Sequence, residues 1–264
     1  MKVVIIGSGN AATVMGSRIA EAGHLIVQVM ARRAEPAARL AAEWNCVYTT
    51  QWESVDTTAD IYIASVSDRA LEGLGSLLSL PGKLVVHTAG AVAGSVLAPV
   101  SERWGVLYPL QSLRSEIRPY PVFPLLVTAS QPEDLTVISD FARTISPQVR
   151  EADDATRLKL HVAATSVNNF TNWLYTQAEL FCSREKLDFS LLHPLIAETS
   201  QRLQRCSPRD VQTGPAIRGD QGTIRRHLEV LNNYKDLREL YQLFSLQIQR
   251  FYRGEDSTGD PIDE

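Results

Sequence analysis

The chain has 264 residues, of which 44% are hydrophobic and 7% aromatic, a composition typical of a folded globular protein with a substantial core. Its 26 basic and 30 acidic residues give a net charge of -4, which excludes a dominant basic surface, so neither DNA nor RNA is an expected partner. Cys46, Cys182 and Cys206 fit no CxxC or metal-binding spacing, so we expect reduced thiols and no metal site. No apolar run suits a signal peptide or a membrane span, and we therefore expect a cytoplasmic protein without membrane contact.

The first predicted element is a buried strand that leads into a glycine-rich turn. Residues 2–6 read KVVII, an apolar, β-branched run typical of a central parallel strand. In the turn that follows, Gly7 permits a tight bend, Gly9 lets the backbone approach a pyrophosphate, and Ala12 allows close packing of the next helix. In this strand-turn-helix context the pattern predicts a dinucleotide site made by Gly7, Ser8, Gly9, Asn10, Ala11 and Ala12. A glycine-rich turn in a sheet that binds no nucleotide is the alternative.

The second strand indicates which dinucleotide is bound. It spans 26–30, and an NAD site would place an acidic residue near its end to hold the ribose hydroxyls. This chain has Arg32 and Arg33 there instead, and two guanidinium groups can bind the 2′-phosphate of NADP. The sequence therefore predicts NADP as the cofactor, unless both arginines are solvated loop charges.

Strands and helices then alternate as far as residue 150. We expect strands at 46–48, 60–66, 83–87, 105–108, 123–128 and 148–150, with helices at 34–44, around 71–78 and at 132–144. This order predicts an α/β fold, a Rossmann doubly wound parallel sheet, over residues 1–152.

Polar residues follow three of these strands at the edge of the sheet where such folds bind ligands. Ser65 and Val66 lie at the end of one strand, and His87, Thr88 and Gly90 lie at the end of the next; we assign all five to the cofactor site. Tyr108 and Gln111 lie at the end of the third strand and are assigned to the substrate. Ordinary turn chemistry is the alternative for each group.

From residue 153 onward the pattern becomes helical. Apolar residues recur at helical spacing to residue 251, which predicts an all-helical domain over 153–252 that begins with a long helix at 154–181. Residues 253–264 contain five acids and no apolar periodicity, so we expect a disordered acidic tail.

The long helix carries a polar line in which candidate catalytic residues lie. At 100° per residue, Asn168 and Asn172 fall within about 20° of the direction of His161. Short polar side chains on a helix favour a cleft or an interface over open solvent. A structural histidine and amides that bridge helices are the alternatives.

A tight segment between later helices reads TGPAIRGD over 213–220. Its glycines and proline predict a rigid loop, and Arg218 could bind an anionic group of a substrate. A connector held by a structural pair between Arg218 and Asp220 is equally compatible with the sequence.

Five stretches together resemble a family of Rossmann-like oxidoreductases with a helical C-terminal domain of unknown function. They are GSGNAA at 7–12, HTAG at 87–90, YPLQS at 108–112, HVAATSVNNFTNWLY at 161–175 and TGPAIRGD at 213–220. The family is related to pyrroline-5-carboxylate reductases, F420-dependent NADP oxidoreductases and the 6-phosphogluconate-dehydrogenase-like group. The resemblance covers nearly the whole chain and implies NADP binding in the first domain, a substrate site at the domain junction and a homodimer through the helical domain.

The chain departs from related proteins in ways that bear on its mechanism. Hydroxyacid dehydrogenases of the wider group use a lysine with an asparagine four residues later, whereas Lys159 is followed at that spacing by Ala163, so a lysine mechanism does not transfer. Ala89 stands where relatives often have serine, and Leu113 and Arg114 follow Ser112 where an aromatic residue is common.

These observations lead to a hypothesis with two alternatives. We expect an NADPH-dependent oxidoreductase that reduces a C=O or C=N group of a small, carboxylated metabolite. His161 would be the general acid, because imidazole exchanges protons near neutral pH, and Asn168 and Asn172 would orient the substrate. Tyr108, Gln111 and Arg218 would contact the substrate. A catalytically silent NADP-binding regulatory or redox-sensing dimer is one alternative, and hydride supply by F420 is the other.

Overall fold

The computed structural model describes residues 1–254, which form two compact units. The first unit is Met1–Asn168, and the second begins at Asn169. The chain changes from sheet to helix near residue 152, where the sequence predicts a domain boundary, and the first unit extends beyond that point to include helix α5. All but the first two residues of the predicted tail at 253–264 lie outside the described range.

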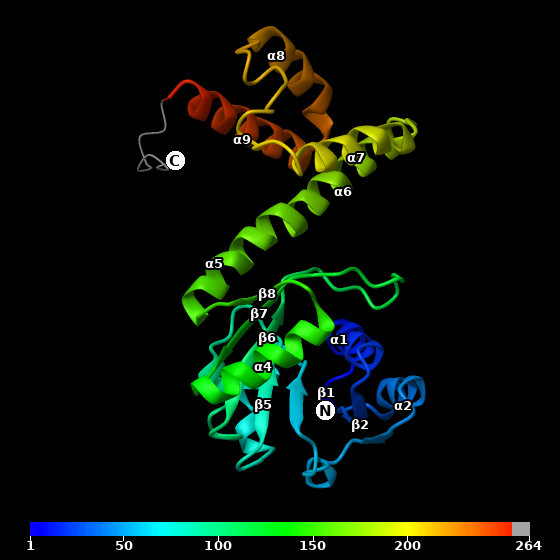
Figure 1. The fold of residues 1–264 in the computed structure, drawn as a ribbon. Helices are drawn as coiled ribbons and strands as arrows, with labels where there is room; N and C mark the ends of the chain where they lie inside the picture. Colours follow the sequence, from blue (N-terminus) through cyan, green and yellow to red (C-terminus); the bar gives the residue numbers. More distant parts are fainter. Residues whose placement is uncertain (255–264) are drawn as a thin grey trace. The chain divides into compact units, whose positions relative to one another are not determined.

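An eight-stranded, mostly parallel sheet forms the centre of the first unit (Figure 1). Its strands are β1 (Lys2–Ile6), β2 (Leu25–Met30), β3 (Val47–Thr49), β4 (Ile61–Ala64), β5 (Leu84–His87), β6 (Trp104–Pro109), β7 (Leu125–Ala129) and β8 (Val149–Glu151). Their order is β3-β2-β1-β4-β5-β6-β7-β8. The order reverses direction between β1 and β4, which is the switch point where doubly wound sheets bind ligands, and the predicted fold class is confirmed.

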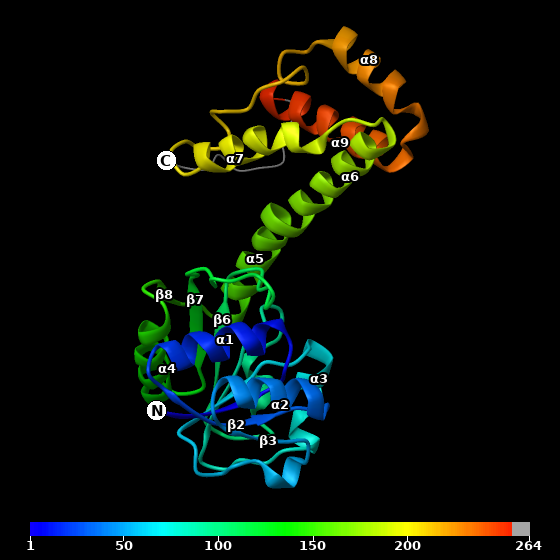
Figure 2. The ribbon, with the colours of Figure 1, turned by 90° about the vertical axis from the view of Figure 1, so that its right-hand side faces the viewer.

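Helices cover both faces of this sheet. Helices α1 (Asn10–Glu21), α2 (Ala34–Glu43) and α4 (Pro132–Ile145) lie on one face, as Figure 2 shows. The other face carries α3 (Asp68–Glu72) and short 3-10 turns, among them Leu74–Ser76 and Gly94–Leu97. Strands β1 and β4 explain this arrangement, because their apolar residues are fully buried and alternate between the two layers.

Strand β7 departs from the expected parallel sheet because it runs antiparallel to β6. Residues 110–124 connect the two strands and contain no helix. A parallel neighbour would need a crossover helix to return the chain to the opposite edge, so the connection without one produces an antiparallel pair. Helix α4 then supplies such a crossover, and β8 is parallel to β7.

Helix α5 (Asp154–Ala164) ends the first unit and continues into a π-helical segment, Thr165–Phe170. The Asp153 carboxylate caps α5 by accepting the Thr156 N–H at 2.7 Å. Thr165 and Ser166 both donate their hydroxyl protons to carbonyls four residues back, which is a pattern that bends helices. A π turn holds more residues than an α turn, so the 100° spacing that predicts Asn168 in line with His161 does not hold through this segment.

The second unit is helical, with α6 (Thr171–Arg184), α7 (His193–Arg202), α8 (Gln221–Val230) and α9 (Lys235–Tyr252). Short 3-10 turns at Phe189–Leu192 and Leu231–Asn233 precede α7 and α9, and α9 packs against α6 and α8. No residue of α9 is buried in the isolated chain. None of the helices within residues 1–254 is long and apolar enough to cross a membrane.

Candidate functional site: a dinucleotide pocket and a histidine-tyrosine pair

The turn after β1 has the geometry that phosphate binding requires. Gly7 has φ +125°, and a Cβ there would lie 2.1 Å from the carbonyl oxygen of Ser65, so no other residue fits without displacing the backbone. At Gly9, by contrast, a side chain would meet no obstacle, because apart from its two chain neighbours no residue has an atom within 4 Å of the position that its Cβ would take. The space beside Gly9 is therefore open to a ligand, as close approach of a pyrophosphate would need.

Helix α1 begins at this turn without a cap of its own. No side chain caps its N-terminus, and its first turn holds no acidic residue. Its free N–H groups and positive dipole end are thus available to an anion. Ala12 is fully buried between the helix and the sheet. The side chain of Asn10 accepts a hydrogen bond from the Ser115 hydroxyl at 2.7 Å, which ties the loop after β6 to the head of α1.

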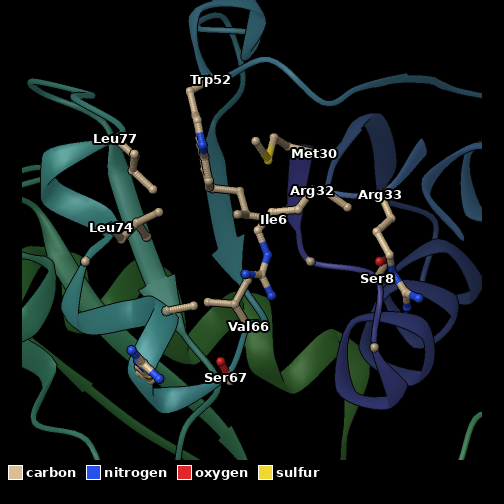
Figure 3. A pocket seen from close by; sticks show the side chains of 16 residues that line it. Ile6, Ser8, Met30, Arg32, Arg33, Trp52, Val66, Ser67, Leu74 and Leu77 are labelled. Carbon is tan, nitrogen blue, oxygen red and sulfur yellow. The ribbon is translucent and has the colours of Figure 1, made fainter.

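A pocket of about 930 Å³ opens beside this turn (Figure 3). Six of the residues assigned to the cofactor from the sequence line it: Gly7, Ser8, Gly9, Arg32, Arg33 and Val66. Figure 3 shows the guanidinium group of Arg33 beside Ser8, and the apolar side chains of Trp52, Leu74 and Leu77 at one end of the pocket. The pocket combines a phosphate-binding turn, cationic groups and an apolar end, which suits an adenosine phosphate.

Sequence reasoning missed several lining residues. Arg69 adds a third guanidinium from α3, and Trp52 comes from a 3-10 turn after β3. The rule that ligands lie at the carboxyl ends of strands could have indicated Arg69, because β4 ends at Ala64 and Arg69 follows it closely. No motif marks Trp52, which reaches the pocket only because its chain segment folds back over β2.

A second cluster joins three residues assigned from separate motifs. The Tyr108 hydroxyl and Nδ1 of His161 are 2.9 Å apart, and the two rings meet edge to face with centroids 5.8 Å apart. Gly90 packs against both, because a Cβ there would lie 2.6 Å from Nδ1 of His161 and 2.9 Å from Cζ of Tyr108. The end of β6, helix α5 and the turn after β5 thus meet at one point of the first unit.

The turns after β4 and β5 are linked to each other by side chains. The Thr88 hydroxyl donates to Oγ of Ser65 at 3.2 Å. His87 is completely buried, and its Nδ1 accepts the N–H of Ala89 at 3.1 Å, so the ring holds the turn and is not accessible to a ligand in this structure. Burial first, and then the positive charge of Arg157, lower the pKa of His87 to about 4.

This buried histidine predicts a loss of stability in acid. His87 binds a proton at about pH 6.5 when unfolded but at about pH 4 when folded, so the unfolded state takes up protons first and stability falls as the pH drops between these values. We expect the free energy of unfolding to fall by about 2 kcal/mol from this residue between pH 7 and pH 5. Urea unfolding of the protein and of His87→Gln at both pH values measures this change in the free energy of unfolding. An equal pH dependence in the two proteins would show that protonation of His87 is not its source.

The remaining assigned residues do not join either cluster. Asn168 and Gln111 are exposed, and the Gln111 side-chain oxygen accepts the backbone N–H of Ser112. Asn172 and Arg218 are exposed on the second unit.

Asp220 caps α8, with its carboxylate accepting the N–H and hydroxyl of Thr223 at 2.9 and 2.7 Å. Within residues 1–254, Arg218 and Asp220 form no ion pair, so the structural pairing considered from the sequence is absent there.

Comparison with known proteins adds to this geometry. Residues 2–90 match the family described as NADP oxidoreductase, coenzyme F420-dependent, and residues 123–248 match a domain of unknown function, DUF2520. A candidate NADP oxidoreductase from Bacteroides fragilis is 35% identical, with 94% of this chain and 98% of that chain aligned and a TM-score of 0.87. Among curated proteins, no sequence matches this chain significantly.

Two more distant structures show the same fold. Pyrroline-5-carboxylate reductase from Streptococcus pyogenes is 14% identical, covers 94% of this chain and 98% of its own, and has a TM-score of 0.63. A reductive aminase from Aspergillus terreus, solved in complex with NADPH4, cyclohexanone and allyl amine, is 16% identical, covers 98% and 96%, and has a TM-score of 0.68.

The fold is that of the pyridine-nucleotide-dependent oxidoreductases. The chain belongs to the family of Rossmann-fold NADP oxidoreductases whose C-terminal region is the DUF2520 domain, as the resemblance in the sequence predicts. In the part of the chain that the structure describes, no group of three or more His, Cys, Asp or Glu residues is arranged to hold a metal ion.

Proposed function

We propose that the protein is an NADPH-dependent reductase that acts on a C=O or C=N group of a small, carboxylated metabolite. The observation that carries this proposal is the pocket in which an uncapped helix N-terminus, an open space beside Gly9 and the side chains of Arg32 and Arg33 face one cavity. The reductases and aminases that share the fold support the reaction class.

The residues of the pocket fit NADP. The amides at the head of α1 would hold the pyrophosphate, and Arg32 and Arg33 would pair with the 2′-phosphate. The apolar side chains at the other end suit the adenine ring. When bound, the cofactor supplies the hydride, and the protein supplies its orientation and a proton.

His161 is the proton donor in this proposal. Its ring is half-buried and held by Tyr108, so it is fixed in position yet reachable from outside. The N–H of a held imidazole can protonate the oxygen or nitrogen of the substrate as hydride reaches the neighbouring carbon. Asn168 and Gln111 would contact the substrate from the same unit. The roles assigned to Asn172 and Arg218, in the second unit, stay predictions.

We also propose that the second unit is covered by a second copy of the chain. Large apolar side chains are exposed on its helices, including Trp173 at 49%, Leu195 at 62% and Phe244 at 38%. Apolar side chains of this size, exposed on several helices of one unit, are typical of a surface that a partner covers. A symmetric dimer is the commonest way in which identical chains bury it, and sedimentation at micromolar concentration would show the dimer mass.

Charge at the end of β2 decides the cofactor in this proposal. Replacing both arginines, Arg32→Ser and Arg33→Ser, should weaken NADPH binding by about 10²-fold and leave NADH binding nearly unchanged, because two charge-assisted contacts to the 2′-phosphate are lost. Calorimetric titration measures both affinities. Arg39→Ser is the matched control, since Arg39 is an exposed arginine of α2 that does not line the pocket.

The proposed function as a whole is tested in two steps. NADP should raise the melting temperature of the protein more than NAD does, because a ligand of the folded state stabilises it by mass action. NADPH should then be oxidised in the presence of at least one keto acid or cyclic imine of a broad panel. Tight binding without oxidation across the panel would favour the regulatory dimer, and hydride transfer from reduced F420 alone would assign the chemistry to that cofactor.

A further inference from the structure

Arg157 is a buried arginine that sequence analysis did not assign. It precedes His161 by one turn of α5, and it is 1% exposed. One nitrogen of its guanidinium group, Nη2, donates to the carbonyl of Val92 and pairs with Asp154 at 2.8 Å. The other two, Nε and Nη1, are buried without a hydrogen-bond partner. A charge that is only partly paired is costly to bury, so its position calls for a reason beyond packing.

Arg157 and Asp154 fasten the turn after β5 to the start of α5. The Asp154 carboxylate accepts the N–H of Gly94 at 3.2 Å, while Arg157 binds the carbonyl of Val92. The same turn contains Gly90, which packs against the rings of Tyr108 and His161. This ion pair, between the buried Arg157 and the exposed Asp154, therefore fixes the backbone that supports the histidine-tyrosine pair.

The charge of Arg157 also acts on Tyr108. Burial raises the pKa of the Tyr108 hydroxyl, and the nearby positive charge opposes this effect by favouring the phenolate. Besides Arg157, the ionisable group in contact with Tyr108 is His161, which lies on the same helix as Arg157. Asp154 pairs with Arg157 and offsets part of its charge, and the nearby His87 is uncharged at neutral pH because burial lowers its pKa to about 4. From β7 and the segment before α5, the neighbours of Tyr108 are Leu126 and Ala152, both uncharged.

We propose that Tyr108 and His161 form a proton relay whose counter-charge is the buried Arg157. The inference rests on the proposed function and specifies how its proton is delivered. The two atoms lie 2.9 Å apart, and the relay requires that Tyr108 donates its hydroxyl proton to Nδ1 of His161. The neutral imidazole then carries its own proton on Nε2, and the His161 ring is the more exposed of the two. His161 is thus the catalytic residue, and Tyr108 and Arg157 are positioning residues.

The proton balance follows from this arrangement. The Nε2–H bond of His161 breaks and its proton joins the oxygen or nitrogen of the substrate, whose carbon receives the hydride. Nδ1 takes the proton of Tyr108, so the imidazole stays neutral and a phenolate forms beside the positive charge of Arg157. After the product leaves, Nε2 of His161 takes one proton from the buffered solvent, and the proton on Nδ1 returns to the phenolate of Tyr108. The substrate has then gained one hydride and one proton, and the protein is restored.

The relay can be tested on the full chain without any cofactor. Nitrogen-15 NMR of labelled histidine at pH 8 reports which ring nitrogen carries the proton. We expect His161 to hold it on Nε2, and Tyr108→Phe to reduce that preference about fivefold, because the hydrogen bond that selects the tautomer is lost. Tyr241→Phe is the matched control: its hydroxyl lies 2.8 Å from Nδ1 of His227 in the second unit, so His161 should not respond.

The role of Arg157 has a separate readout in tyrosine absorbance. The ionisation of Tyr108, obtained as the difference from Tyr108→Phe, should move up by about one pH unit in Arg157→Met and by less in Arg157→Lys, which keeps a cation. Unchanged ionisation in Arg157→Met would overturn the counter-charge. If Arg157→Met does not fold, the ionisation of Tyr108 in Arg157→Lys tests the counter-charge, and the His161 tautomer in Tyr108→Phe tests the relay.

Each failure points to one claim. An unchanged His161 tautomer in Tyr108→Phe overturns the relay, even if NADPH binds and is oxidised. A protein whose melting temperature does not respond to NADPH overturns the proposed function, whatever the tautomer of His161.

Discussion

Replacing His161 with alanine should slow reduction of a substrate by about 10²-fold or more while leaving NADPH affinity nearly unchanged. The imidazole is the proton donor of the proposed reaction, and it lies outside the pocket that carries the phosphate-binding turn and the arginines. Steady-state kinetics with a substrate found in the panel gives the turnover number, and calorimetric titration gives the affinity.

The second unit offers a matched control for this prediction. His227 contacts the hydroxyl of Tyr241 at 2.8 Å, and their rings meet edge to face with centroids 5.6 Å apart, which closely repeats the geometry of the His161 pair. His227→Ala should therefore leave turnover and affinity unchanged. A loss of NADPH binding in His161→Ala as large as the loss of turnover would count against the assignment of the proton donor.

Gly7→Ala should destabilise the fold by roughly 2–4 kcal/mol and abolish cofactor binding. Its φ of +125° is strained for any residue with a Cβ, and that atom would lie 2.1 Å from a backbone oxygen at the end of β4. Both the strand and the turn would have to shift. Urea unfolding measures the stability, and a thermal shift with NADPH measures the binding.

Gly9→Ala separates binding from folding in the same turn. The added methyl group meets no atom of the protein within 4 Å, and φ at Gly9 is -85°, which alanine adopts readily. We expect nearly wild-type stability and NADPH binding weakened about tenfold or more, because the methyl group occupies space that the pyrophosphate needs. Unchanged affinity in Gly9→Ala would mean that the phosphates lie elsewhere.

Much of the first unit could be predicted from its strands. The β-branched runs at residues 2–6 and 61–64 are too apolar and too short for exposed helices, and their glycine-rich or polar ends mark the edge where ligands bind. Such local signals determine which helices and strands form. They do not determine the direction in which a strand runs in the sheet, and the sequence therefore predicted a parallel β7. In the structure β7 is antiparallel to β6, because the connection between them contains no helix.

Only part of the candidate site could be predicted, because local sequence signals indicate strand ends but not how a helix packs. Residues at the ends of strands, such as Arg32 and Tyr108, could be found because the topology of the sheet brings them to one edge. Arg157 could not, because an arginine on a helix ordinarily points to solvent, and only the packing of α5 against the turn after β5 buries it. The π segment at Thr165–Phe170 could not be predicted, because residue propensities describe this stretch as a regular helix.

The reversed direction of β7 bears on how substrate preference can diverge within the family. Strand β6 ends and β7 begins at the edge where ligands bind, so the connection over residues 110–124 leaves from that edge and returns to it. Within the connection, Leu113, Tyr120 and Phe123 pack against the core. Insertions or substitutions there alter what surrounds the reaction centre without disturbing the hydrogen bonds of the sheet. Relatives that keep the same eight strands can thus acquire new specificities by varying this one segment.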